Sequence, residues 1–220
     1  MTNAENKLLR ALPRLLLAGL VLFELLNEFG ILHYTLDFTW FGLAITSIIA
    51  WVVLEFSSYS LKKACLPANG LSRRQWQAGG KAMNFWAIMT AVAVVYVDAL
   101  GDILHFYGRF GWYDQLAHFA GGAAVAGLIF NVVWQLCSCQ KIRLGNLGIG
   151  FITIASTAFV CALYEIEEYL EDYFTGSHRL GDGFDTANDL MLGILGAITI
   201  VILINIALKI YASHKSNSRH

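Results

Sequence analysis

The segment YDQLAHFAGGAAVAGLIF, residues Tyr113–Phe130, begins with two ionisable residues and then becomes almost wholly apolar. Asp114 and His118 are four residues apart, so a helix places them on one face. The apolar run continues to Leu136, which gives it the length of roughly 20 residues that a helix needs to cross a membrane. The segment therefore predicts a transmembrane helix that carries a polar pair at one end.

The composition of the whole chain agrees with a membrane protein. Of its 220 residues, 57% are hydrophobic and 14% are charged. Soluble domains carry about 25% charged residues, so most of the surface of this protein is expected to face lipid. The net charge of -1 gives no indication of a nucleic-acid partner. We therefore expect membrane lipid around the chain and no nucleic acid bound to it.

Six apolar windows in the chain are long enough to cross a membrane. They are Leu12–Leu32, Phe38–Phe56, Met83–Phe106, Leu116–Leu136, Leu147–Tyr169 and Leu190–Tyr211. The first window resembles a signal peptide, but Glu24 and Glu28 interrupt it and it shows no cleavage pattern of small residues. We interpret it as a retained helix and predict a single six-helix transmembrane domain over residues 1–220.

Lysine and arginine residues predict how these helices are oriented. Only Arg109 and Arg179 fall on one side of the expected membrane, whereas the other 13 of the 15 basic residues fall on the opposite side. Cytoplasmic loops carry an excess of lysine and arginine. The predicted fold class is therefore an all-α polytopic membrane protein with six transmembrane helices and both termini cytoplasmic.

Acidic residues gather at the outer side of this arrangement. Fourteen of the 16 lie at or near the outer helix ends: Glu24, Glu28, Asp37, Asp98, Asp102, Asp114, Glu165, Glu167, Glu168, Glu171, Asp172, Asp182, Asp185 and Asp189. Acidic residues contribute little to membrane topology. Orientation therefore does not explain their distribution, and those set close to apolar sequence need another explanation.

Helical spacing indicates which ionisable residues share a face. The shared faces hold Asp98 with Asp102 and His105, Asp114 with His118, Glu165 with Glu168, Asp185 with Asp189, and Glu24 with Glu28, whereas Glu167 and Glu171 are expected to point elsewhere. Like charges four residues apart repel, so these faces need a cation or a proton nearby.

Small residues continue the same faces toward the membrane interior. Gly121 and Gly122 follow His118, and Gly193 and Gly196 follow Asp189. Small residues let membrane helices approach closely, and ionisable residues within a membrane usually face the bundle interior. We therefore expect the acidic faces to converge on one polar cavity that opens to the outside.

Three segments resemble a known family. YDQLAHFAGG, CALYEIEEY and GDGFDTANDLMLGILGA are similar to a bacterial inner-membrane family of unknown function, the DUF2238-type family, which is broadly similar to VanZ-like proteins. The matching motif residues are Asp114, His118, Tyr164, Glu165, Glu168, Gly181, Asp182, Asp185, Thr186 and Asp189. The resemblance covers roughly Tyr113–Ala197. It implies a multi-pass protein of the bacterial inner (plasma) membrane, and it implies no reaction.

The residues themselves predict a metal site. Carboxylate-bridged two-metal sites in helix bundles use Glu-x-x-His pairs, and Asp102-x-x-His105 has this spacing with aspartate in place of glutamate. Mixed oxygen and imidazole ligands suit Zn, Mn or Fe. The candidate ligands are Asp98, Asp102, His105, Asp114, His118, Glu165, Glu168, Asp185 and Asp189. The alternative is a structural network in which both histidines bond to their neighbouring aspartates and join the helices.

Three classes of function follow. The first is a metal-dependent hydrolase or transferase that acts on a lipid or lipid-linked substrate at the outer leaflet. Glu165 or Glu168 would be the general base, and Arg109 and Arg179 would bind an anionic headgroup. The second is a proton- or cation-coupled carrier. The third is a metal-binding or structural membrane component without turnover, so whether the protein is an enzyme stays open.

One sequence feature favours the first class over a carrier. A carrier usually needs a polar path through the membrane. The cytoplasmic halves of the last four predicted helices are apolar apart from single polar residues such as Thr90, Asn131 and Asn205. A cavity that opens on one side fits chemistry at the membrane surface better than transport.

Overall fold

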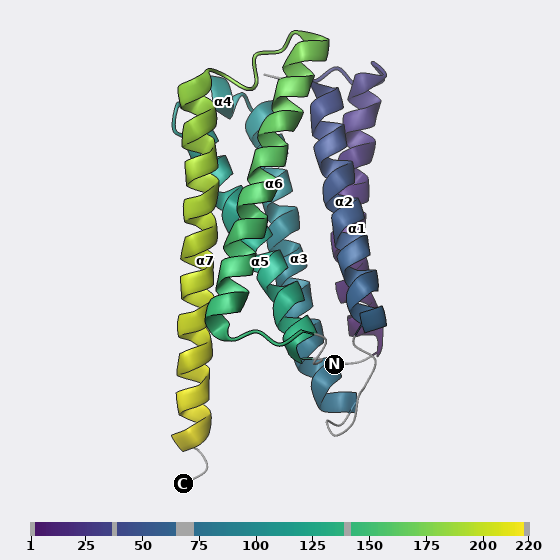
Figure 1. Ribbon diagram of the computed structural model, residues 1–220. Helices are drawn as coiled ribbons and strands as arrows, with labels where there is room; N and C mark the ends of the chain where they lie inside the picture. Colours follow the sequence, from purple (N-terminus) through teal and green to yellow (C-terminus); the bar gives the residue numbers. More distant parts are fainter. Residues whose placement is uncertain (1–2, 37–38, 65–72, 139–141, 218–220) are drawn as a thin grey trace.

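The computed structural model describes residues 3–36, 39–64, 73–138 and 142–217, and these residues form helices without any strand (Figure 1). The helices are α1 (Asn3–Glu28), α2 (Trp40–Ala64), α3 (Arg73–Ile103), α4 (Phe106–Arg109), α5 (Tyr113–Ser138), α6 (Asn146–Thr175) and α7 (Gly183–Asn217). The expected all-α fold is confirmed, and each apolar window lies largely within one of the six long helices.

Several helix ends differ from the predicted windows because polar residues continue the helices beyond the apolar runs. α7 begins at Gly183 rather than Leu190, and α5 begins at Tyr113. α1 instead stops at Glu28, where Gly30 adopts a left-handed φ of 68° that favours glycine. Phe38, the predicted start of the second window, lies outside the described residues.

Within the described residues, five helices contain a span that is long and apolar enough to cross a membrane, by length and composition: Trp40–Ser57, Phe85–Ile103, Tyr113–Ser138, Asn146–Thr175 and Gly183–Tyr211. α1 is not among these spans, because its apolar part also carries Arg14, Glu24 and Glu28. Glu24 is fully buried and accepts a hydrogen bond from the Ser47 hydroxyl of α2 at 3.0 Å, whereas Glu28 is exposed.

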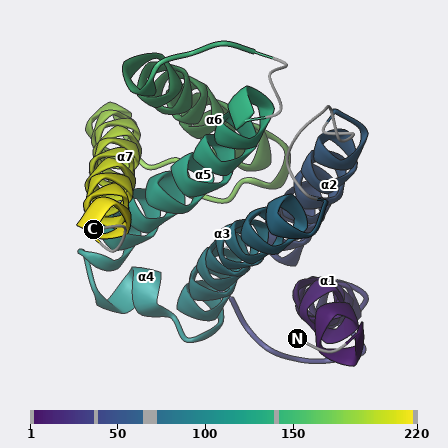
Figure 2. The same cartoon turned by 90° about the horizontal axis from the view of Figure 1, so that it is seen from below.

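The long helices pack around α5, which contacts α3, α6 and α7, while α1 packs on α2 and α3 (Figure 2). Three apolar clusters fill the described part of the bundle. One joins Leu17 and Leu54 to Val92 and Leu128, a second includes Phe130, and a third includes Leu20 and Leu43. The first turn of α1 and the last turn of α7 lie at the same end of the bundle (Figure 1). The segment that joins α6 to α7 and the start of α5 lie together at the opposite end.

Glycines hold α5 and α7 in backbone contact. A Cβ atom on Gly122 of α5 would overlap the carbonyl oxygen of Gly193 in α7, and one on Gly196 would overlap the carbonyl oxygen of Phe119. Gly193 also faces the thiol of Cys161 in α6. The predicted close approach through small residues is therefore confirmed at this contact. Any side chain at Gly122 or Gly196 would push the two helices apart.

We expect Gly122→Val to destabilise the protein by about 1–3 kcal/mol, the usual cost of overpacking a core. Gly127→Val is the matched control, because it makes the same change in α5 at a position where a Cβ atom meets no neighbour. Thermal unfolding in detergent, followed by intrinsic fluorescence, should give a lower transition temperature for Gly122→Val alone. Equal stability of the two variants would contradict the backbone contact.

Candidate functional site

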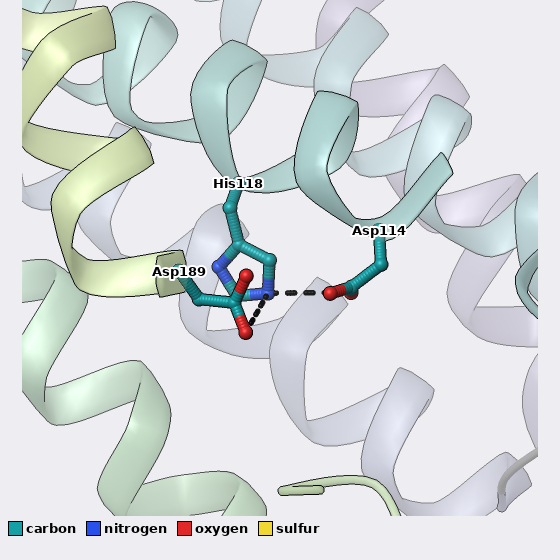
Figure 3. A group of neighbouring side chains, drawn as sticks. All are labelled: Asp114, His118 and Asp189. Atoms are coloured by element: carbon teal, nitrogen blue, oxygen red, sulfur yellow. Dashed lines mark ion pairs between the residues drawn. The ribbon is translucent and has the colours of Figure 1, made fainter. Parts of the chain in front are cut away.

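His118 of α5 lies at the centre of a group of carboxylates. Its Nε2 atom lies 3.4 Å from Oδ1 of Asp114, one turn earlier on the same helix, and 3.8 Å from Oδ2 of Asp189 in α7 (Figure 3). The exposed fraction of the side chain falls from 35% for Asp114 to 11% for His118 and 4% for Asp189. The three residues thus extend from the surface into the bundle.

The other ring nitrogen of His118 faces a different helix. Its Nδ1 atom lies 3.8 Å from Oε1 of Glu165 in α6. Two sets of possible metal ligands, each with ligand atoms within 4.8 Å of one another, therefore share this imidazole. One set is Asp114, His118 and Asp189, and the other is His118, Glu165 and Glu168.

The packing of the helices accounts for this convergence. Gly122 and Gly193 come one turn after His118 and Asp189 in their helices, so their backbone contact brings these two side chains close together. Asp182 supports the start of α7, since its Oδ1 accepts hydrogen bonds from the backbone N–H groups of Phe184 (2.8 Å) and Asp185 (3.0 Å). The site therefore depends on helix starts and small residues that lie close to it in sequence.

Buried acids outnumber buried bases in the described part of the chain. The buried carboxylates are those of Glu24, Asp102, Glu165, Glu168, Glu171 and Asp189, whereas Arg179 is the one buried basic residue. Oε2 of Glu165 and Oδ1 of Asp189 are buried without a hydrogen-bond partner. An unpaired carboxylate is costly to bury. The arrangement therefore requires protons or bound cations beside these oxygens.

Arg179, in the segment between α6 and α7, pairs with carboxylates of α6. Its Nε donates to Oε1 of Glu168 at 3.0 Å, its Nη1 donates to Oε2 of Glu171 at 3.1 Å, and its Nη2 donates to the Tyr164 hydroxyl. The guanidinium also lies 5.3 Å from the centroid of the Tyr164 ring. This residue is thus surrounded by partners from the protein.

The electrostatic surroundings keep Arg179 charged. Burial lowers the pKa of its guanidinium, but its interactions with Tyr164 and with the carboxylates of Asp98, Glu168 and Glu167 raise the pKa more, so that it lies well above its ordinary value. Asp172 fixes the backbone here by accepting hydrogen bonds from the N–H groups of Arg179 (2.8 Å) and Leu180 (3.1 Å).

Glu171 and Tyr164 were not predicted to take part in such a network. The expectation that Glu171 points away is wrong: it bonds to Arg179 and also accepts a hydrogen bond from the Thr39 hydroxyl. Glu167 is half-buried with its Oε2 atom enclosed. The last turns of α6 contact polar partners on more than one side, so the prediction of a single inward-facing acidic face was too narrow. The three-residue spacing of Glu165 and Glu168 continues to Glu171, and this spacing could have indicated that Glu171 belongs to the network.

The predicted face of α3 is only partly formed. α3 ends at Ile103, and His105 has a left-handed φ of 58°, so the expectation that His105 continues the face of Asp98 and Asp102 is wrong. The His105 ring instead lies 3.2 Å from the Thr35 hydroxyl. Among the described residues, neither set of possible metal ligands includes Asp98, Asp102, His105 or Asp185.

A tyrosine of α4 contacts the last turns of α3. Oδ1 of Asp98 accepts a hydrogen bond from the Tyr107 hydroxyl at 2.5 Å. Burial and the charge of Asp98 raise the pKa of this phenol above its ordinary value, so the hydroxyl keeps its proton. Asp102 is buried, and Arg109 is exposed at the end of α4. A cavity that opens outward above His118 stays a prediction.

Comparison with known proteins identifies a family. Residues 38–210 match the family described as "Predicted membrane protein (DUF2238)". The match covers more than three quarters of the chain and includes α2 and α3, which the resemblance over Tyr113–Ala197 did not reach. No curated protein and no solved structure matches the chain. The broader likeness to VanZ-like proteins stays a prediction. This chain, a multi-pass membrane protein by its apolar helices, belongs to the DUF2238 family.

Proposed function

We propose that this protein holds a divalent metal ion between α5 and α7 and uses it to act on a lipid or lipid-linked substrate at the outer membrane surface. The observation that carries the proposal is the position of His118 Nε2, which faces Asp114 at 3.4 Å and Asp189 at 3.8 Å. The unpartnered, buried Oδ1 of Asp189 adds a second carboxylate oxygen that needs a cation.

These separations suit a shared ion. Two ligand atoms that each lie about 2.1 Å from a tetrahedrally coordinated ion are about 3.4 Å apart. The separations around His118 Nε2 are 3.4 and 3.8 Å, so small side-chain movements bring all three groups to an ion. One imidazole and two carboxylates fit Zn, Mn or Fe. Three protein ligands leave a coordination position for water or substrate.

Glu165 supports the Nε2 side as the place of the ion. A neutral imidazole binds a metal through one nitrogen and donates its N–H from the other, usually to a carboxylate or carbonyl. Glu165 Oε1 lies 3.8 Å from Nδ1 and suits this acceptor role. Glu168 is already paired with Arg179 at 3.0 Å, so the Nδ1 side has fewer free oxygens for an ion.

The chemistry follows from an ion with an open position. A bound metal lowers the pKa of its water and polarises a phosphoryl or acyl oxygen. Of the two candidate bases, Glu168 is ion-paired with Arg179 and Glu165 faces the ring nitrogen opposite the proposed ion; we therefore propose that Glu165 holds the imidazole in its metal-binding tautomer, and we assign neither residue as the base for a metal-bound water. Of the two outer arginines, Arg109 is exposed and remains the candidate for an anionic headgroup, because Arg179 is enclosed by its protein partners.

The location is proposed from the orientation of the chain. The family resemblance and the distribution of basic residues support a bacterial inner membrane, six spans with α1 as the sixth, and both termini in the cytoplasm. The first turn of α1 and the last turn of α7 share one end of the bundle, as an even number of crossings requires (Figure 1). The His118 group then lies toward the outer leaflet.

Reporter fusions check this orientation. Fusions after Gly111 and Gly176 should report the outer compartment, and fusions after Gly70 or Gln140 should report the cytoplasm, because basic residues concentrate in the latter two loops. Gly70 and Gln140 themselves lie outside the described residues. Alkaline phosphatase and a cytoplasmic fluorescent reporter give opposite signals at the four positions. A reversed pattern would place the His118 group at the cytoplasmic surface and exclude an outer substrate.

Elemental analysis checks the metal. Protein purified without chelators should contain close to one equivalent of Zn, Mn or Fe, and Asp189→Asn or His118→Ala should lower metal affinity by at least about 100-fold, because each removes a ligand. Asp185→Asn is the matched control on the same helix, since Asp185 belongs to neither ligand set. Wild-type protein without metal, before and after incubation with these ions, would refute the proposal.

A proton- or cation-coupled carrier is the second candidate. Buried carboxylate oxygens without partners occur on α1, α6 and α7, at Glu24, Glu165, Glu167 and Asp189, and groups of this kind carry protons in transporters. Deeper in the bundle, the Thr153 and Thr157 hydroxyls donate to carbonyls of their own helix. Because both hydroxyls are bonded within α6, they offer protons or cations no polar path across the membrane, and this supports a site that is closed toward the cytoplasm.

Proteoliposomes separate the two functions. We expect no proton or divalent-cation flux above that of empty vesicles when the reconstituted wild-type protein is placed in an ion gradient. An enclosed pH-sensitive dye and a metal-sensitive dye record the two fluxes, and His118→Ala protein is the control for leakage. Flux that requires His118 would favour the carrier over the enzyme.

A further inference from the structure

We propose that Arg179 determines which side of the His118 ring receives the ion. This inference rests on the proposed metal site and names a positioning residue for it. Arg179 holds Glu168 in an ion pair and so keeps it from binding a metal ion together with His118 and Glu165. The ion therefore binds to the other set of ligands, Asp114, His118 and Asp189.

Glu168 is both a possible metal ligand and an ion-pair partner of Arg179. It belongs to one set of possible metal ligands, whose ligand atoms lie within 4.8 Å of one another, and its Oε1 also accepts from Arg179 Nε at 3.0 Å. The exposed fractions of the two side chains are 7% and 4%, so water screens the pair weakly. A permanently charged guanidinium beside Glu168 competes with a divalent ion for the same carboxylate.

Arg179 is held in place by contacts outside both ligand sets. Asp172 binds its backbone N–H at 2.8 Å, and Glu171 binds its Nη1 at 3.1 Å. The Tyr164 hydroxyl accepts from Nη2, and the Tyr164 ring also meets the His118 imidazole edge to face, with ring centroids 5.8 Å apart. The position of the guanidinium beside the site is therefore set by the fold, with or without an ion.

The two sets differ in what they offer a substrate. The first set contains Asp114, whose side chain is 35% exposed, so an ion bound there is reachable from the surface. The second set consists of His118 and two carboxylates that are 6% and 5% exposed, so an ion bound there would be enclosed. Selection of the first set by Arg179 keeps the proposed ion accessible to water and substrate.

The decisive test is rescue of a variant that has lost its ion. Asp189→Asn removes a ligand of the first set and should bind Zn²⁺ poorly. The double variant Asp189→Asn/Arg179→Gln frees Glu168 for the second set and should bind Zn²⁺ roughly 10- to 100-fold more tightly than Asp189→Asn, the usual size of effects from groups around the ligands. Adding Glu168→Gln should abolish this gain. Competition with a fluorescent Zn²⁺ chelator in detergent measures all three affinities.

Other outcomes distinguish the possible failures. Wild-type protein that binds no Zn²⁺ would refute the metal site itself and the inference with it. Wild-type binding together with no rescue in a folded double variant would refute the role of Arg179 alone. A purely structural arginine predicts only losses, because its removal leaves Glu168 and Glu171 buried without their partner.

A single variant covers the case in which Arg179→Gln does not fold. Glu168→Gln in the wild-type background keeps the ligands of the first set and should change Zn²⁺ affinity by less than about threefold, well below the 10- to 100-fold effect of a supporting ligand partner. Retained affinity supports the assignment of Glu168 to Arg179. Loss of Zn²⁺ binding would show that Glu168 is itself a ligand and would overturn the inference.

Discussion

The carboxylates buried inside this apolar bundle must be neutralised for the protein to fold. Glu165, Glu168 and Asp189 are each no more than 6% exposed, and they lie on two helices that face His118. Charged groups are rarely buried unless cations or hydrogen bonds compensate them. Arg179 compensates Glu168 and Glu171, so the carboxylates around His118 are left to be neutralised by protons or by an ion.

The glycine contact between α5 and α7 brings these buried groups together. It brings the backbones of Gly122 and Gly193 together one turn from His118 and Asp189, and so places an imidazole and a carboxylate from two helices within 3.8 Å. Larger residues would favour apolar packing but would separate the ligands. The same contact therefore stabilises the bundle and forms the site, which links the fold to the proposed chemistry.

The sequence predicted the parts of this arrangement that depend on local rules. Lipid requires long apolar helices, so the windows were visible, and helical spacing placed Asp114 with His118 and the small residues below them. What it did not predict depends on tertiary contacts. The bond from Thr39 to Glu171 joins residues 132 positions apart, and His105 left its expected face because α3 ends two residues earlier. Arg179 was expected to bind an anionic headgroup, but it is buried beside Glu168 and Glu171, which lie in α6 before the loop that carries it.

The ion can be located directly in an anomalous difference map from crystals of the wild-type protein, collected at the absorption edge of Zn, Mn or Fe. We expect one peak between α5 and α7, about 2.1 Å from Nε2 of His118 and bordered by Asp114 and Asp189. A peak on the Nδ1 side, against Glu165 and Glu168, would contradict the assignment of the ion. Crystals soaked in these ions that show no peak near His118 would contradict the metal site as a whole.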